Sequence, residues 1–171
     1  MVAKVKNNYW ATLFVSLFFC IVSSSSVIAS GEGNELMPDF SLPSVSDGTM
    51  IDSDDFKGKV LLVNFFATWC PPCLKEIPIL VNLQKNFAEQ NFSVIGFSVD
   101  NTENMEALKK LMTKTEINYP VVIADEKAKK GFGANLLPMT FLIDKKGVRV
   151  KSYFGERKSS VFEKDINELL E

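Results

Sequence analysis

Histidine is absent from the 171-residue sequence, and this absence excludes many kinds of reactive site. Histidine is the commonest protein ligand for metals and a frequent general base in enzymes. Its absence excludes Ser-His-Asp triads, Cys-His proteases, and zinc or copper sites that rely on imidazole. Covalent haem attachment needs a histidine directly after a Cys-x-x-Cys motif, where this sequence has Leu74. The chemistry must therefore rest on cysteine, carboxylates or lysine.

Two further features are missing. The sequence has no glycine-rich phosphate-binding loop, so we expect no flavin or nicotinamide cofactor. Its 19 Lys and Arg residues are spread among 21 Asp and Glu residues without a basic block, so we expect no nucleic-acid partner. The length, with 46% hydrophobic residues, instead favours one well-buried domain.

The first thirty residues have the composition of an export signal. A positively charged start is followed by a continuous apolar stretch over residues 11–22 and then by small residues. This stretch is short for a membrane span, which needs about 20 residues, so an uncleaved anchor through residues 9–29 is the alternative interpretation. We expect residues 1–30 to be a signal peptide or N-terminal membrane anchor. Residues 31–171 would then form one extracytoplasmic domain, located in the periplasm.

Cysteine is scarce, with three residues in the chain, and Cys20 lies within the apolar stretch. The large Phe19 before it argues against a lipoprotein cleavage site, where a small residue is expected. The exported domain then contains only Cys70 and Cys73. A disulfide between cysteines this close in sequence closes a loop too small to stabilise a fold strongly. The spacing therefore favours redox chemistry over structural cross-linking.

Hydrophobic patterning predicts strands alternating with helices. Residues 59–67 form a continuous run rich in β-branched and aromatic side chains, typical of a central strand covered on both faces. Pro71 and Pro72 then fit the first turn of a helix that continues to about residue 88. Further strands are predicted over residues 92–99, 121–123, 139–144 and 148–154, and further helices over residues 102–114, 127–132 and 159–170. Before the central strand, we expect an extended edge segment over residues 37–43 and a hairpin or turn over residues 45–55. This pattern indicates an α/β domain with a mixed sheet flanked by helices.

The motif Cys70-Pro71-Pro72-Cys73 would begin the first helix. A thiol exchanges disulfides as its thiolate, which the N–H groups and dipole of a helix N-terminus stabilise. Cys70 is therefore the expected nucleophile, and Cys73, one turn later, is the expected resolving cysteine. Half of a zinc site is the alternative, but the exported domain has no further cysteine or histidine to complete it. We expect a redox-active Cys70–Cys73 disulfide, no metal and no bound cofactor.

The residues around the motif resemble a known family. The segment FATWCPPC over residues 66–73 is similar to the active site of thioredoxin. The following LKEIP over residues 74–78 resembles the continuation found in exported reductases of the TlpA/ResA type. The resemblance runs from Met37 onward and includes LPMTF over residues 137–141. It implies a thioredoxin fold with an N-terminal β extension and a central insertion.

The resemblance also implies a surface that binds substrate. Pro138 would form a cis peptide bond and face the cysteines, and the backbone of its neighbour Leu137 would pair with an extended peptide. Trp69, Pro71 and Pro72 would border the same surface. Without the resemblance, Pro138 would be interpreted as an ordinary loop proline.

A proton acceptor is implied as well. Thioredoxin has a buried aspartate where this sequence has Asn64, which cannot take a proton. Glu76 follows Cys73 by three residues, and the resemblance assigns to it the tuning of the cysteine pair and the acceptance of its proton. The alternative for Glu76 is a solvated glutamate in an early helical turn.

Three functions stay open at this point. The favoured one is a reductase of exported cysteine-containing proteins, with apocytochrome c as the substrate and a membrane thiol-disulfide protein as the electron donor that the resemblance implies. The second is a disulfide-forming oxidase or isomerase, which usually has a strongly activated first cysteine. The third is a copper chaperone, since soft thiolates suit Cu(I), although two cysteines without histidine make a poorly selective site.

Overall fold

The computed structural model describes residues 35–171. The signal peptide or membrane anchor expected over residues 1–30, together with Cys20, lies outside the described residues. Within the described part of the chain, no helix has both the length and the apolar character needed to cross a bilayer.

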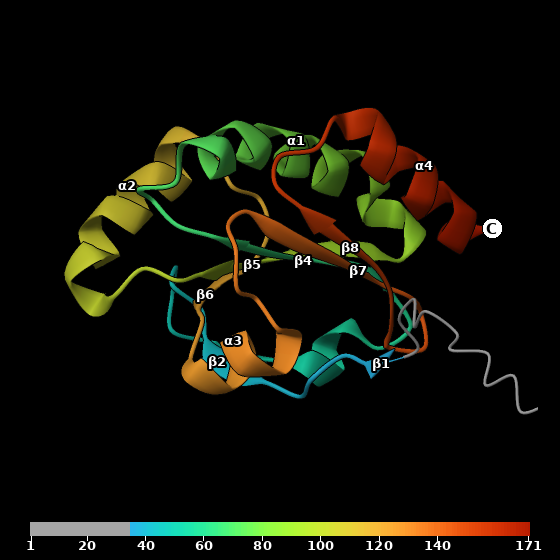
Figure 1. The fold of residues 1–171 in the computed structure, drawn as a ribbon, viewed down its shortest axis with the longest axis horizontal. Helices are drawn as coiled ribbons and strands as arrows, with labels where there is room; N and C mark the ends of the chain where they lie inside the picture. The colour runs from blue at the N-terminus through green and yellow to red at the C-terminus, as the bar shows by residue number, and fades with distance from the viewer. Residues whose placement is uncertain (1–34) are drawn as a thin grey trace, which may run out of the picture. The chain divides into compact units, whose positions relative to one another are not determined.

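A six-stranded mixed sheet forms the middle layer (Figure 1), with the strands in the order β1-β8-β7-β4-β5-β6. The strands are β1 Glu35–Leu36, β4 Val60–Phe66, β5 Phe92–Ser98, β6 Val121–Ile123, β7 Met139–Ile143 and β8 Val148–Phe154. β4 pairs in parallel with β5 and antiparallel with β7, and all of its residues are buried. The predicted central strand over residues 59–67 is confirmed.

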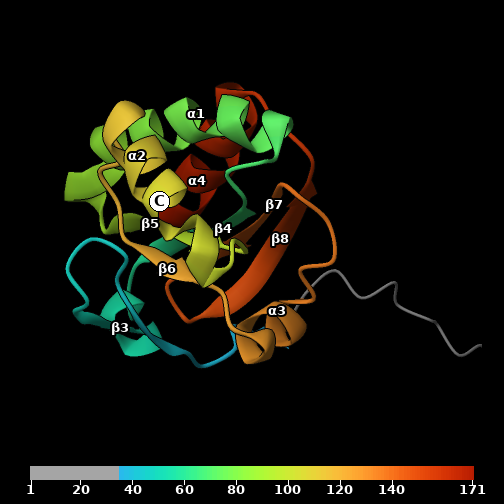
Figure 2. The same cartoon turned by 90° about the vertical axis from the view of Figure 1, so that its left-hand side faces the viewer.

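Helices cover both faces of the sheet. Figures 1 and 2 show α1, α2 and α4 on one face, and α3 with the hairpin β2–β3 on the other. The helices are α1 Pro71–Phe87, α2 Met105–Lys114, α3 Glu126–Phe132 and α4 Ser159–Leu170; the hairpin strands are β2 Ser41–Pro43 and β3 Met50–Asp52; short 3-10 turns are η1 Ser53–Phe56, η2 Ala88–Gln90 and η3 Thr102–Asn104. The predicted fold class, an α/β domain with a mixed sheet between helices and an N-terminal β extension, is confirmed.

The sheet separates two hydrophobic cores. Successive side chains of a strand point to opposite faces, so β4 contributes to both cores. Val60, Leu62 and Phe66 pack toward α1 and α4. Leu61, Val63 and Phe65 pack toward α3 and the hairpin. This double burial explains the unbroken apolar run in the sequence. Asn64 is the single polar residue of β4, and it lies on the α1 side, where the reactive centre forms.

The N-terminal part differs in detail from the sequence prediction. The expected extended segment over residues 37–43 is divided, because β1 pairs with β8 whereas β2 pairs with β3. The hairpin therefore starts earlier than the predicted 45–55, and Gly48 supplies the positive φ of 77° in its turn. Leu42 explains the earlier start, since it is buried in the core beneath α3 and fixes the strand there.

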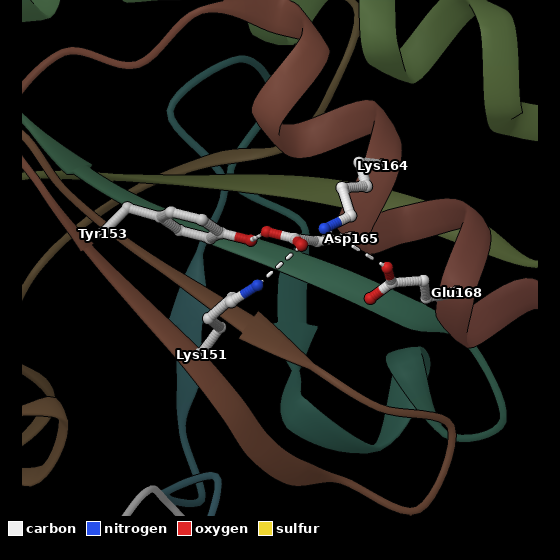
Figure 3. A network of polar contacts seen from close by, with 5 residues as sticks. All are labelled: Lys151, Tyr153, Lys164, Asp165 and Glu168. Atoms are coloured by element: carbon white, nitrogen blue, oxygen red, sulfur yellow. Dashed lines mark hydrogen bonds and ion pairs between the residues drawn. The ribbon is translucent and has the colours of Figure 1, made fainter.

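A polar network joins α4 to β8 (Figure 3). Asp165 is buried and accepts hydrogen bonds from the Tyr153 hydroxyl at 2.7 Å and from the Lys151 ammonium at 2.6 Å. Burial raises the pKa of Asp165, but these two donors outweigh burial and hold that pKa below its usual value. The neighbouring ion pair of Lys164 and Glu168, 3.7 Å apart, lies on the exposed side of the same helix.

We expect Asp165→Asn to lower the free energy of unfolding by about 2 kcal/mol at pH 7, because hydrogen bonds to a charged group are lost. Since folding lowers the pKa of Asp165, its contribution is present above the unfolded pKa of 3.8 and is lost as the pH falls through the folded value. Urea unfolding at several pH values measures both effects. Removing the exposed Lys57–Asp54 pair, which lies elsewhere on the surface, is the control and should change stability by less than about 0.5 kcal/mol. If the difference in free energy of unfolding between wild type and Asp165→Asn is as large in acid as at pH 7, the proposed role of the Asp165 charge is contradicted.

Candidate active site

The reactive centre lies where β4 ends and α1 begins. Pro71 and Pro72 occupy the first positions of α1, where a missing N–H group leaves no hydrogen bond unmade. Cys70 is the N-cap residue, and its sulfur accepts a hydrogen bond from the Cys73 backbone N–H at 3.3 Å. A disulfide joins the two cysteines, so the structure holds the oxidised form of the motif.

The two sulfur-bearing residues differ in their surroundings. Cys70 is 5% exposed and borders a surface groove with a volume of about 630 Å³, whereas Cys73 is 1% exposed and lies in the core beneath it. The indole of Trp69 stands at the rim of the groove and is 64% exposed. A molecule seated in the groove therefore reaches Cys70 before Cys73.

The segment before β7 forms another part of the groove wall. Leu136 and Leu137 line the groove together with Trp69, Pro71 and Pro72. The structure thus brings together four of the residues that the resemblance placed at a substrate surface: Trp69, Pro71, Pro72 and Leu137. The peptide bond from Leu137 to Pro138 is cis, and Pro138 itself is buried behind the groove wall.

Glu76 is not solvated, because its carboxyl is enclosed between α1 and the sheet and is 1% exposed. Its Oε2 accepts hydrogen bonds from the Asn64 amide at 3.0 Å and from the Thr140 hydroxyl at 3.3 Å. Its Oε1 accepts a hydrogen bond from the Arg157 backbone N–H at 3.1 Å. These donors come from β4, from β7 and from the loop after β8. The carboxyl lies one helical turn after Cys73 on the same side of α1.

Enclosure changes the proton affinity of this carboxyl. Burial raises the pKa of Glu76 to about 7, and the charge of Glu156 raises it as well. Hydrogen bonds from Arg157 and Thr140 and the charge of Arg157 act in the opposite direction, because they stabilise the ionised form. A group with a pKa near 7 can take up and release a proton under neutral conditions.

Asp100 is a buried acidic residue that the sequence analysis did not identify. It follows β5 and accepts hydrogen bonds from the Thr68 backbone N–H at 2.9 Å, the Thr68 hydroxyl at 2.7 Å and the Ser98 hydroxyl at 2.7 Å. Through these bonds, the loop that contains Trp69 and Cys70 is attached to the end of the neighbouring strand, β5. The one available signal was its place after a buried parallel strand, where loops carry functional side chains.

The chain is similar to known thiol-disulfide oxidoreductases. A family model described as Redoxin matches residues 32–170. Thiol-disulfide oxidoreductase ResA of Bacillus subtilis (strain 168) is 34% identical over 137 residues, covering 80% of this chain and 74% of that protein.

Among residues 35–171, no group of three or more Cys, His, Asp or Glu residues is arranged so that it could hold a metal ion.

Solved structures show the same architecture. A thiol:disulfide interchange protein of the thioredoxin family from Chlorobium tepidum TLS superposes with a TM-score of 0.73 at 33% identity, covering 81% of this chain and 97% of that one. A putative thiol:disulfide interchange protein DsbE from Chlorobium tepidum gives a TM-score of 0.75 at 24% identity, covering 83% and 100%. The expected thioredoxin fold is therefore confirmed. With its Cys70–Cys73 disulfide at the start of α1, the chain belongs to the Redoxin family and is a thiol-disulfide oxidoreductase similar to ResA.

Proposed function

We propose that the chain is a protein-disulfide reductase that acts on exported proteins containing cysteine. The buried Glu76 carboxyl, with its pKa near 7 and its place one turn after Cys73, is the observation that carries this proposal. Reduction of a substrate requires the second cysteine to lose a proton in a site that water does not reach. A buried carboxylate of this pKa supplies the base for that step.

The surroundings of Cys70 also favour reduction over oxidation. Within the described part of the chain, its sulfur accepts a hydrogen bond from the Cys73 backbone N–H and from no charged side chain. Strongly oxidising centres stabilise the thiolate of the reduced form and therefore hold their disulfide less firmly. A centre in which no charged side chain donates a hydrogen bond to the first sulfur gives up electrons more readily.

In the first step, the Cys70 thiolate attacks one sulfur of a substrate disulfide. A bond forms between the Cys70 sulfur and that substrate sulfur, and the other substrate sulfur leaves as a thiolate. Cys70 is the sulfur that meets the groove, which supports its assignment as the nucleophile. The product is a mixed disulfide between enzyme and substrate.

In the second step, the Cys73 thiol transfers its proton to the Glu76 carboxylate. The Cys73 thiolate then attacks the Cys70 sulfur, forms the Cys70–Cys73 disulfide and releases the second substrate sulfur as a thiolate. Two electrons have passed from the enzyme dithiol to the substrate disulfide. The proton held by Glu76 becomes available to a departing thiolate or to solvent.

The groove beside Cys70 fits an extended peptide. Trp69 and Leu137 offer apolar contacts on its two sides, and the backbone before Pro138 is the proposed pairing edge for the substrate. Exported proteins with an exposed disulfide between two cysteines are the proposed substrates. Apocytochrome c before haem attachment is included among them because the resemblance to TlpA/ResA-type reductases implies it.

We place the protein outside the cytoplasm, in the periplasm, with residues 1–30 as a signal peptide or as an anchor to the inner membrane through residues 9–29. Exported compartments are oxidising, so the dithiol must be regenerated by two electrons from another dithiol. A membrane thiol-disulfide protein is the proposed donor.

The reduction potential of the full chain tests this function. Equilibration in defined glutathione or dithiothreitol buffers should give a value near the thioredoxin end of the scale, about -270 mV. A value near about -120 mV, typical of a strong oxidant, would contradict the proposal and favour the formation of disulfides.

Substitution of each cysteine tests the order of attack. The reduced Cys73→Ser variant, given a peptide with an internal disulfide, should accumulate a mixed disulfide because no second thiol resolves it. The Cys70→Ser variant should accumulate at least about tenfold less, since Cys73 is enclosed. Non-reducing electrophoresis and mass spectrometry measure both adducts. Equal adduct formation by the two variants would overturn the assignment of Cys70 as nucleophile.

A further inference from the structure

A buried tyrosine hydroxyl near the reactive centre has no hydrogen-bond partner. Tyr119 immediately precedes Pro120 and β6, and it is 6% exposed. Over residues 35–171, its hydroxyl is the only buried side-chain nitrogen or oxygen that neither donates nor accepts a hydrogen bond within the protein. Buried polar groups nearly always have partners, so this hydroxyl calls for an explanation.

The ring of Tyr119 lies over Gly96 of β5. A β-carbon added at Gly96 would lie 3.4 Å from Cε2 of Tyr119, and closer still to the Phe66 ring at 3.0 Å and to Val121 at 3.3 Å. The phenol ring therefore packs directly over the sheet at this position. The ring belongs to the same core as Cys70 and Cys73, on the α1 side.

This position brings the ring of Tyr119 close to Asn64, one of the hydrogen-bond donors to Glu76. Gly96 pairs with Asn64 in the parallel register of β4 and β5, and the Asn64 amide donates to Glu76 at 3.0 Å. Tyr119 thus occupies the layer between sheet and helix that also encloses the carboxyl. Burial raises the pKa of Tyr119, and the charge of Glu76 raises it further, so the phenol keeps its proton and can act as a donor.

We propose that Tyr119 is a positioning residue for the redox reaction, whose hydroxyl donates a hydrogen bond to the Glu76 carboxylate through one bridging water. The inference rests on the proposed role of Glu76 as the acceptor of the Cys73 proton. Tyr119 gives up no proton in this scheme. Its hydroxyl stabilises the ionised carboxylate, and so it keeps Glu76 ready to accept a proton at neutral pH.

Other groups also act on the charge of Glu76, and the test must leave them unchanged. Glu156 and Arg157, from the loop after β8, affect its pKa in opposite directions. Cys73 lies one helical turn before it in α1, while Asn64 and Thr140 contribute uncharged donors from β4 and β7. Removing a single hydroxyl from Tyr119 alters none of these groups.

Tyr119→Phe removes that hydroxyl and keeps the ring. In the oxidised full chain, we expect the pKa of Glu76 to rise by about one unit, since a donor to its ionised form is lost. The pH dependence of side-chain carboxyl ¹³C shifts measures this pKa, and the Glu76 signal is identified by its loss in Glu76→Gln. At about pH 5, where Glu76 is protonated in both folded proteins, the thermal midpoint of Tyr119→Phe should stay close to that of wild type, because the hydroxyl has no direct hydrogen-bond partner within the protein.

Tyr153→Phe is the matched control. The Tyr153 hydroxyl is also enclosed and belongs to the same core, but it already has a partner within the protein, because it donates to Asp165 at 2.7 Å. This variant should lower the thermal midpoint and leave the pKa of Glu76 unchanged. The two tyrosine variants are thus expected to separate an effect on proton affinity from an effect on stability.

A substitution that strengthens the hydroxyl of residue 119 as a hydrogen-bond donor completes the test. Site-specific 3-fluorotyrosine at position 119 keeps the hydroxyl and makes it a stronger donor, so the pKa of Glu76 should fall. Equal Glu76 titrations in wild type, Tyr119→Phe and the fluorinated chain would overturn the inference. If instead Glu76→Gln resolves mixed disulfides as fast as wild type at every pH, the proposed function of Glu76 fails, which is a distinguishable result.

Discussion

The carboxyl of Glu76 is buried between α1 and the sheet, and its hydrogen bonds connect parts of the chain that are far apart in sequence. Asn64 and Thr140 face each other in the register of β4 and β7, and both contribute to binding Oε2. Arg157 closes the other side through its backbone N–H, 81 residues from Glu76. The carboxyl takes its high proton affinity from the same enclosure. Correct assembly of the domain therefore creates a carboxyl of high proton affinity one helical turn after Cys73, which is the proposed base.

The two cysteines differ in their accessibility to a partner protein. Cys70 caps α1 at the edge of the groove, where a partner can reach it, while Cys73 is enclosed near the carboxyl. Asp100 binds Thr68 in the loop before Cys70, so the position of Cys70, the proposed nucleophile, depends on the end of β5 as well. On the same face of the sheet, Asp165 connects α4 to β8 through Lys151 and Tyr153 (Figure 3).

Much of the fold could be predicted from the sequence because its signals are local. The apolar run of β4 and the Pro71-Pro72 helix start each depend on neighbouring residues, and both strand and helix are confirmed. The supporting residues of the site depend on tertiary contacts instead. Arg157 acts through its backbone N–H, so its side chain gives no signal. The ring of Tyr119, the proposed positioning residue, packs over Gly96 of another segment, and sequence patterns do not show such a contact.

The most direct test of the role of Glu76 is the rate at which a preformed mixed disulfide on Cys70 is resolved, measured by stopped flow as a function of pH. The account predicts a wild-type rate that rises with one ionisation near pH 7, following the Glu76 carboxylate. Glu76→Gln should be slower by about a hundredfold at neutral pH and should rise only toward the ordinary thiol pKa of about 8.5. Superimposable profiles for the two proteins would contradict proton transfer from Cys73 to Glu76.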